Sequence, residues 1–430
     1  MMSPWLSAIL AGAALCFYVG WPWYTMWKRA KSLGLPVIVE GSQWQRHRRH
    51  TAQAFNKKTH ENVWAETLKE TSMLLEYWTN DESKTITRSD LAALSLAVLC
   101  RVCFGMSEGD ATREKTGMIT SELRLFLKSI TRPAVFGPLS KQEKKDVAAS
   151  QQTLKRFMAK LVETRRDASS SRQGSSDLIA WLLGTIDSDQ FSEDEIMGNL
   201  FLFIFAGHET TAGTLGYIIH LLAIYPAWQD WVIEEVDLIY QESTRDGNPD
   251  YSETYHRLTR LRAVLFETLR LYGPVPTIVR KSDKQHNQVV TVGQKEVVIP
   301  GDCQVYINTI AIHTDPDDWG PDSQTWRPDR WISEASSTLS ECEFSSEMSK
   351  CIFAWGDGPR MCPGRKFSQV EILASLLRLF MGHRVEIVPR AGQSLQDARS
   401  EAYSLIQDST VGLTLQMPGH RPVNLRWIRR

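Results

Sequence analysis

The chain has 430 residues and a formal net charge of −1, from 49 basic and 50 acidic side chains with histidine counted as neutral. This balance excludes an ordinary polybasic nucleic-acid binder, so we expect no nucleic-acid partner. The 42% hydrophobic and 23% charged content excludes a disordered chain, and seven cysteines over this length argue against a disulfide-stapled secreted module.

The amino terminus carries an apolar run, Trp5–Val19, with no charged side chain before Lys28. The run approaches the length that crosses a bilayer, and basic residues follow it without preceding it, which predicts a cytosolic position for the rest of the chain. We predict one transmembrane helix within residues 1–31 and a single domain over residues 32–430. A cleaved signal peptide is the alternative, disfavoured because the sequence lacks a basic n-region.

Helical patterns dominate the rest of the chain, and strand signals are few and late. The predicted helices cover Asn62–Trp78, Asp90–Cys103, Lys141–Arg166, Ser192–Tyr225, Ala227–Tyr240 and Leu258–Tyr272. The predicted strands are Val289–Val292 and Val297–Pro300, joined as a hairpin by Gly293–Glu296, then Val305–Asn308, Arg384–Val388 and Val411–Leu415. The predicted fold class is therefore mainly α with a small β portion.

Trp44 and Arg48 are four residues apart and would share one face of a helix. From spacing alone, a basic amphipathic surface helix explains them. Cys100 and Cys103 could suggest metal or redox chemistry, but no second cysteine pair lies nearby. Two packed helical cysteines are the favoured interpretation.

The segment Ala206–Thr211 has the sequence Ala-Gly-His-Glu-Thr-Thr and follows Leu200–Ala206, which is apolar all round and predicts a buried helix. Ser192 and Glu195 form the pattern of a capping box at the start of that helix. Glu209 and Thr210 would thus place an acid and a hydroxyl inside the protein, which suits proton delivery to bound dioxygen. Hydrogen bonding to the helix backbone alone is the alternative.

Glu267 and Arg270 are three residues apart among apolar neighbours, which predicts a buried ion pair that needs further hydrogen bonds. An ordinary helical salt bridge is the alternative.

Trp355–Gly364 combines three glycines, two prolines and one cysteine, Cys362, in a segment that predicts a tight loop. Apolar residues after it recur at helical spacing, so Pro363 suits the first helical position and Cys362 the helix N-terminus. The helix dipole there favours an anionic sulfur, and a single thiolate is the ligand that a haem iron needs for O–O cleavage. A buried structural cysteine or a catalytic nucleophile are the alternatives.

Together these motifs resemble the cytochrome P450 monooxygenase family, in the form found in fungal secondary metabolism. The resemblance implies a cytochrome P450 fold and haem b (iron protoporphyrin IX), with Cys362 as the axial iron ligand. It departs from the family at Trp355, where a phenylalanine is usual.

The resemblance also assigns roles to other residues. Thr210 matches the oxygen-activating threonine and Glu209 the acid before it, while His208 lies at a variable position. Glu267, Arg270 and Arg330, the last within Pro328-Asp329-Arg330-Trp331, match a structural triad beneath the haem. The residues expected to contact haem propionates are Trp44, Arg48, Arg280 and Arg360.

The function implied is insertion of one oxygen atom from O2 into a small apolar organic substrate, with electrons from a separate NADPH-dependent reductase. The implied location is the endoplasmic reticulum membrane, single-pass, with a cytosolic catalytic domain. Only Ser32–Gln43 separates the apolar amino terminus from Trp44, so we expect much of the family's N-terminal sheet and first helices to be missing. A catalytically inert remnant and a haem-thiolate isomerase or dehydratase are the alternatives.

Overall fold

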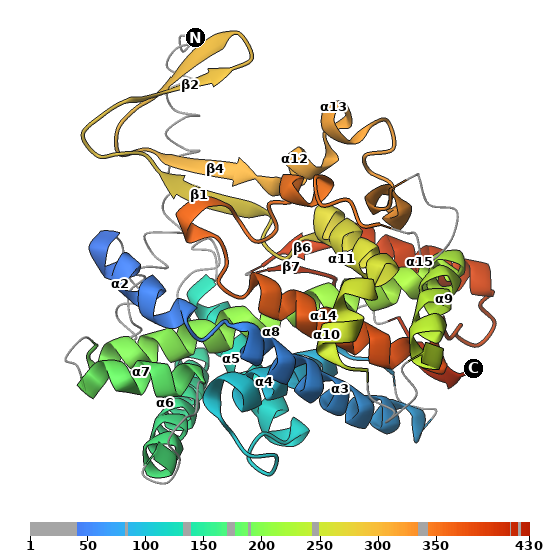
Figure 1. Ribbon diagram of the computed structural model, residues 1–430, viewed down its shortest axis with the longest axis horizontal. Helices are drawn as coiled ribbons and strands as arrows, with labels where there is room; N and C mark the ends of the chain where they lie inside the picture. Colours follow the sequence, from blue (N-terminus) through green and yellow to red (C-terminus); the bar gives the residue numbers. More distant parts are fainter. Residues whose placement is uncertain are drawn as a thin grey trace. The chain divides into compact units, whose positions relative to one another are not determined.

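The computed structural model describes residues 41–81, 85–131, 139–169, 177–187, 191–242, 249–333, 343–412, 414–419 and 423–430. The chain is mainly helical with short antiparallel strand pairs (Figure 1). It divides into two compact units. The first comprises the described part of Met1–Glu70 with Thr87–Glu209, and the second comprises Thr71–Ile86 with Thr210–Arg430.

No helix within these described ranges is long and apolar enough to cross a bilayer. The predicted anchor within residues 1–31 lies outside them.

Among the described residues of the first unit, every regular element is a helix. Its central helix α4 begins at a capping box, in which the Thr87 side chain accepts from the Asp90 backbone and the Asp90 side chain accepts from Thr87. It ends at Gly105, which adopts a φ of +63°, a left-handed conformation that glycine takes without strain. The helices of this unit are α2 (Gly41–Ala52), α3 (Lys57–Thr79), α4 (Arg88–Phe104), α5 (Arg113–Thr131), α6 (Lys141–Ser169), α7 (Leu178–Asp187) and α8 (Glu193–Ile224), with α3 and α8 continuing into the second unit.

Helix α8 confirms the predicted capping box. The Ser192 backbone N–H donates to Glu195 Oε2 at 2.9 Å, and the Glu195 N–H donates to Ser192 Oγ at 3.2 Å. Because both orphan donors are satisfied locally, the helix begins within one residue of the predicted start.

The second unit packs its helices around the buried faces of α11 and α14, where Leu265, Arg270 and Leu373 have no exposed surface. Its α-helices are α9 (Pro226–Glu242), α10 (Tyr251–Thr254), α11 (Thr259–Tyr272), α12 (Thr309–Thr314), α13 (Pro316–Trp319), α14 (Arg365–Phe380) and α15 (Leu395–Gln407). Its 3-10 turns are η2 (Tyr255–Arg257), η3 (Pro328–Trp331), η5 (Met348–Cys351) and η6 (Gly358–Arg360).

The described strands form four antiparallel pairs, all in the second unit. They are β1 (Thr277–Lys281) with β4 (Gln304–Asn308), β2 (Gln288–Val292) with β3 (Lys295–Ile299), β5 (His383–Ile387) with β8 (Leu425–Arg429), and β6 (Thr410–Val411) with β7 (Leu415–Gln416). Register sets Val279 opposite Tyr306 in the first pair and Val290 opposite Val297 in the second.

Two strand predictions were wrong in detail. The hairpin connection is the pair Gly293-Gln294 instead of four residues, because Gly293 adopts φ +61° and supports a two-residue turn. The predicted strand Val411–Leu415 is instead the short pair β6–β7, in which the Gly412 N–H donates to the Thr414 carbonyl at 3.1 Å. A glycine inside a strand pattern often marks such a bend.

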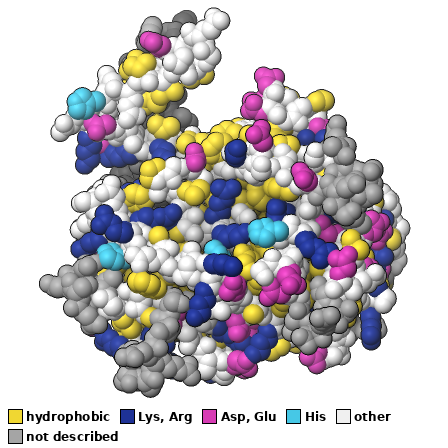
Figure 2. Space-filling model, viewed as in Figure 1, with side chains coloured by type: hydrophobic (Ala, Val, Ile, Leu, Met, Phe, Trp, Pro, Cys, Tyr) yellow, Lys and Arg dark blue, Asp and Glu magenta, His cyan; other side chains and the backbone are white. Residues whose placement is uncertain are grey.

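The β2–β3 hairpin extends away from the helices of its own unit (Figure 1). Its valines are largely exposed, with 59% of Val289 and 61% of Val292 accessible. Figure 2 shows hydrophobic side chains on the surface of this hairpin. The hairpin therefore adds little to the core of the second unit, whose apolar interior comes from its helices.

Candidate functional site

The loop that carries Cys362 is closed by its own backbone. The Cys362 N–H donates to the Trp355 carbonyl at 2.8 Å, and Gly356 and Gly358 between them adopt φ values of +70° and +73°. Glycine takes these values at no steric cost, so the loop can turn back tightly before Cys362. The Trp355 indole N–H also donates to Ser368 Oγ on α14 at 3.1 Å, which ties the loop to the following helix.

Helix α14 begins at Arg365 with Gly364 as its N-cap, so the prediction that Pro363 occupies the first helical position was wrong. A turn over Cys362–Arg365, in which the Arg365 N–H lies 3.4 Å from the Cys362 carbonyl, delays the helix by two residues. Cys362 still lies near the positive end of the helix, three residues before its first residue, and this position favours a thiolate.

The surroundings of Cys362 suit a haem iron better than a metal held by protein ligands alone. Within the described ranges no group of three or more His, Cys, Asp or Glu side chains could hold a metal ion. The Cys362 side chain is partly buried, and a Cβ added at Gly364 would lie 3.9 Å from its sulfur. A single thiolate therefore fits a metal that brings its other ligands with it, as porphyrin iron does.

Helix α11 contributes a buried charge cluster to the same unit. Glu267 and Arg270 have no exposed surface, and Arg270 donates from Nε to Glu267 Oε2 at 2.9 Å and from Nη2 to Oε1 at 2.8 Å. Arg330, in turn η3, donates to Glu267 Oε1 at 3.2 Å. The structure thus brings the three residues of the predicted triad together.

Two further donors complete the hydrogen bonding of the Glu267 carboxylate. The Trp331 indole N–H reaches Glu267 Oε2 at 2.9 Å, and the Arg327 backbone N–H reaches Oε1 at 2.8 Å. A buried ion pair is tolerated only when its remaining lone pairs and protons find partners, and this one meets that condition. The sequence analysis missed Trp331 as a member, although it directly follows Arg330.

Helix α2 of the first unit carries Trp44 and Arg48, both partly buried. The helix is held to the start of α8, because Arg46 forms an ion pair with Glu195 and His47 Nε2 lies 3.2 Å from the same carboxylate. Among the described residues the Arg48 guanidinium has neither an ion pair nor a hydrogen bond, so its charge is free to meet an anionic group such as a carboxylate of a ligand.

Helix α8 carries Glu209 and Thr210. Glu209 is buried and forms an ion pair with Arg88, at the start of α4 in the same unit. His208, interpreted from the sequence as unimportant, is also buried, with Nδ1 2.6 Å from the Ile204 carbonyl and Nε2 3.8 Å from Glu209 Oε2. Burial lowers the pKa of His208, which favours a neutral ring beside the carboxylate. Neither Arg88 nor the burial of His208 was foreseen, since no local pattern indicates either.

Arg280 and Arg360 lie in the second unit. Arg280 is on β1, and its guanidinium donates to the Val279 and Asp357 carbonyls at 3.2 Å each. It has no carboxylate partner among the residues described, so its charge could also meet a carboxylate of a ligand. Arg360 is exposed at the end of turn η6. Arg360 belongs to the Cys362 loop, and Arg280 is bonded to that loop through the Asp357 carbonyl. Trp44, Arg48 and Glu209 belong to the first unit.

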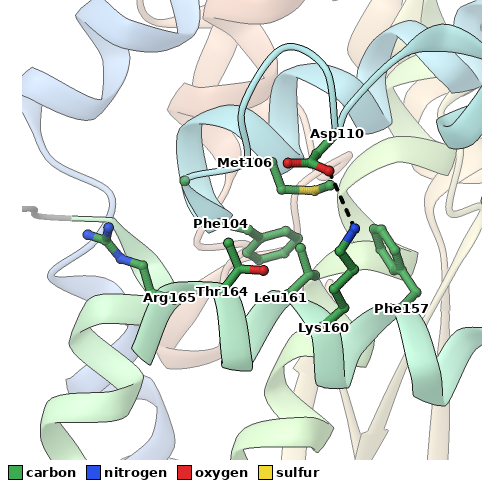
Figure 3. A pocket seen from close by; sticks show the side chains of 9 residues that line it. Phe104, Met106, Asp110, Phe157, Lys160, Leu161, Thr164 and Arg165 are labelled. Carbon is green, nitrogen blue, oxygen red and sulfur yellow. Dashed lines mark hydrogen bonds and ion pairs between the residues drawn. The ribbon is translucent and has the colours of Figure 1, made fainter. Parts of the chain in front are cut away.

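A cavity in the first unit is not the substrate site. It lies between the end of α4 and helix α6, where Lys160 Nζ is 3.4 Å from Asp110 Oδ1 (Figure 3). Its volume is about 40 Å³, enough for a few water molecules and far below the roughly 300 Å³ of small ligand pockets.

Comparisons with known proteins identify the family. The cytochrome P450 family model matches residues 23–411. A cytochrome P450 monooxygenase of Arthrobotrys oligospora is 26% identical over 88% of this chain and 73% of its own length. The cytochrome P450 monooxygenase prx9 of Penicillium rubens is 27% identical over 81% of this chain and 67% of its own. The phomenoic acid biosynthesis cluster cytochrome P450 monooxygenase of Leptosphaeria maculans is 34% identical over 53% of this chain and 42% of its own.

The crystal structure of a cytochrome P450, CYP102L1, has a TM-score of 0.72 at 21% identity and covers 94% of this chain and 87% of its own. The predicted mainly α cytochrome P450 fold is thus confirmed. The chain belongs to the cytochrome P450 family, and its relatives identify it as a cytochrome P450 monooxygenase. Membership implies a haem-thiolate cofactor, O2, a redox partner and an organic substrate.

Proposed function

We propose that this enzyme inserts one oxygen atom from O2 into a small apolar organic substrate in fungal secondary metabolism, with haem b held by the Cys362 thiolate. The observation that carries the proposal is the fully satisfied cluster of Glu267, Arg270, Arg330 and Trp331 in the same unit as the Cys362 loop. The guanidinium groups of Arg48 and Arg280, which have no carboxylate partner among the described residues, suit haem propionates, and Trp44 and Arg360 would assist them.

The proposed chemistry balances when two electrons and two protons accompany each O2. One oxygen atom enters the substrate and the other leaves as water, and haem iron supplies the reactivity toward O2. Glu209 and Thr210 would hold and transfer the protons. Because Arg88 pairs with Glu209, that guanidinium would fix the carboxylate between proton transfers.

The direct test is the spectrum of the full chain expressed with haem supply. We expect the reduced protein with carbon monoxide to give the absorption typical of thiolate ligation, and Cys362→Ser to lose it. Cys351→Ser is the matched control, because Cys351 is an exposed cysteine eleven residues earlier. A colourless wild type, or a Cys362→Ser variant with the wild-type spectrum, would contradict the proposal.

The role of Thr210 is tested through coupling. If Thr210 delivers protons during oxygen activation, Thr210→Ala should lower product formed per NADPH consumed and raise peroxide release. Thr214→Ala is the control one turn later, since that hydroxyl donates to the Thr210 carbonyl at 2.9 Å within the same helix. Unchanged coupling in Thr210→Ala would contradict this role of Thr210, whereas product formed without NADPH consumption would instead favour a haem-thiolate isomerase or dehydratase.

We also propose that the apolar amino terminus anchors the enzyme in the endoplasmic reticulum membrane, where a separate NADPH-dependent reductase would supply electrons. The support is the Trp5–Val19 run followed by basic residues. Deleting residues 1–31 should move the protein from the microsomal to the soluble fraction. Retention in microsomes after the deletion would contradict the anchor.

A further inference from the structure

His313, on helix α12, uses both ring nitrogens in the interior of the second unit. The residue is 2% exposed. Its Nδ1 lies 3.1 Å from the Arg270 carbonyl, and its Nε2 lies 3.0 Å from the backbone nitrogen of Phe353. Since Arg270 belongs to the buried cluster and Phe353 lies nine residues before Cys362, the imidazole connects two parts of the candidate site.

The two partners determine the tautomer of the ring. A carbonyl oxygen can only accept a hydrogen bond, so Nδ1 must carry the proton. The Phe353 N–H can only donate, so Nε2 must offer its lone pair. A protonated ring would turn a second N–H toward the Phe353 N–H and break that bond. Burial also lowers the pKa of His313 to about 4, which keeps the ring neutral at physiological pH.

The Arg270 side of this connection is rigid. The carbonyl of Arg270 lies in the last turn of α11, where carbonyls have no partner within the helix, and His313 supplies one. In return the Arg270 guanidinium donates to the His313 carbonyl at 2.6 Å. Both residues are thus fixed to each other and, through Arg270, to the Glu267 carboxylate.

The Phe353 side is where the Cys362 loop begins. The Phe353 carbonyl accepts from the Gly356 N–H at 2.8 Å, and two residues after Phe353 the Trp355 carbonyl accepts from the Cys362 N–H at 2.8 Å. The Phe353 ring also stacks on the imidazole, with centroids 6.3 Å apart. An amide held at Phe353 therefore fixes the starting point of the loop that ends at the thiol.

We infer that His313 is a positioning residue that joins the Glu267–Arg270–Arg330 cluster to the Cys362 loop through one neutral tautomer. The inference rests on the proposed function for the statement that this loop presents an iron ligand. The loop attachment itself follows from the hydrogen bonds alone. His313 thus acts through the loop backbone and has no contact with the reacting groups.

Two amide variants separate the two bonds. The amide of His313→Gln reaches the position of Nε2 and keeps an acceptor for Phe353, whereas the amide of His313→Asn reaches only the position of Nδ1 and leaves the Phe353 N–H unpaired. We expect His313→Asn to exchange amide hydrogen at Phe353 and along the loop about tenfold faster than wild type, and to bind hemin about tenfold more weakly. His313→Gln should stay near wild type in both measurements.

Both measurements use the full chain, and His286→Asn, an exposed histidine in the same unit, controls for generic effects. If His313→Asn matches wild type in amide exchange and in hemin binding, or if His313→Gln loses as much loop protection as His313→Asn, the inference is wrong. A wild type that takes no haem but shows the expected exchange differences would overturn the proposed function and support the loop attachment. Wild-type haem binding with no difference among the variants would overturn the attachment alone.

Discussion

Glu267 shows at the residue scale how a buried carboxylate is maintained by several independent donors. Two guanidinium groups, an indole and a backbone amide converge on its two oxygens. Moving such a charge out of water is costly, and attraction between charges offsets that cost only when the other hydrogen bonds are present. The neutral donor from Trp331 can be removed by a substitution that keeps an aromatic ring, so it can be tested without removing a charge.

Replacing Trp331 with phenylalanine should therefore destabilise the protein, both by removing this donor and by leaving a small cavity in place of part of the buried indole. We expect Trp331→Phe to lower the free energy of unfolding by about 1–3 kcal/mol, because Glu267 Oε2 loses a buried donor. Urea denaturation measures this change. Trp181→Phe is the control, since Trp181 is 41% exposed and should stay within about 0.5 kcal/mol of wild type. Equal effects of the two substitutions would show that the indole N–H contributes nothing.

Arg88 and Glu209 form a second pair whose members are far apart in the sequence. A double-mutant cycle with Arg88→Gln and Glu209→Gln isolates their interaction. We expect a coupling of about 1–3 kcal/mol in the free energy of unfolding, because Arg88→Gln leaves a buried carboxylate without its cation. Lys57 and Glu61, an exposed pair in the same unit, provide the control cycle and should couple by less than about 0.5 kcal/mol. Similar coupling in both cycles would argue against a special role for Arg88.

At the scale of elements, helix α11 receives its N-terminal cap from another helix. Its N-cap residue, Leu258, has no side chain that can accept a hydrogen bond. Glu235 on α9 accepts instead, from the Arg260 N–H at 2.7 Å and the Leu261 N–H at 3.0 Å. Burial of Glu235 outweighs these bonds and raises its pKa to about 7. The helix that carries Glu267 and Arg270 thus depends on a titratable group outside it.

This cap predicts a specific pH dependence of stability. Between the ordinary pKa of about 4.5 and about 7, the folded state holds a proton on Glu235 that the unfolded state has lost. Stability from this group is therefore full at the acid end and declines as pH rises, by about 3 kcal/mol across the window. Glu235→Gln cannot titrate, so its unfolding free energy minus that of wild type should rise from pH 4.5 to pH 7. If urea denaturation gives the same difference in unfolding free energy between Glu235→Gln and wild type at pH 4.5 and at pH 7, the prediction is wrong.

The sequence predicted elements well where local chemistry defines them. Helices α8 and α11 lie within one residue of their predicted ends, since a capping box and a strong apolar period mark them. Helix α5 was missed although its apolar residues recur as regularly as those of α11, because Gly117 and several β-branched residues lower its helix propensity. The Pro363 position was wrong because the turn over Cys362–Arg365 is set by the loop and not by proline preference.

The candidate site was predictable only as far as motifs extend along the chain. The motifs indicated Glu267, Arg270 and Arg330, and the structure brings them together. Partners supplied from distant segments, such as Arg88 for Glu209 and His313 for Phe353, have no local pattern. Their positions depend on tertiary packing, so the structure was needed to identify them.

At the scale of the whole molecule, the residues predicted to bind haem come from both compact units. Trp44 and Arg48 are in the first unit, while Cys362 and Arg280 are in the second. A ligand that binds only the native state stabilises each segment that must be folded for binding. The stabilisation is about 2.7 kcal/mol when the free ligand concentration is one hundred times its Kd. If each set of residues contacts haem as its motif predicts, haem should protect the segments that carry them.

Hydrogen exchange with and without hemin tests this expectation on the full chain. We expect hemin to slow amide exchange in the Cys362 loop, whose thiolate is proposed to hold the iron, and in α2, whose Trp44 and Arg48 match a propionate-binding motif. Arg48→Gln should reduce the protection of α2 more than that of the loop, and Arg49→Gln, an exposed neighbour, should reduce neither. Protection confined to the Cys362 loop in the wild type would mean that Trp44 and Arg48 do not bind haem, even though the thiolate does.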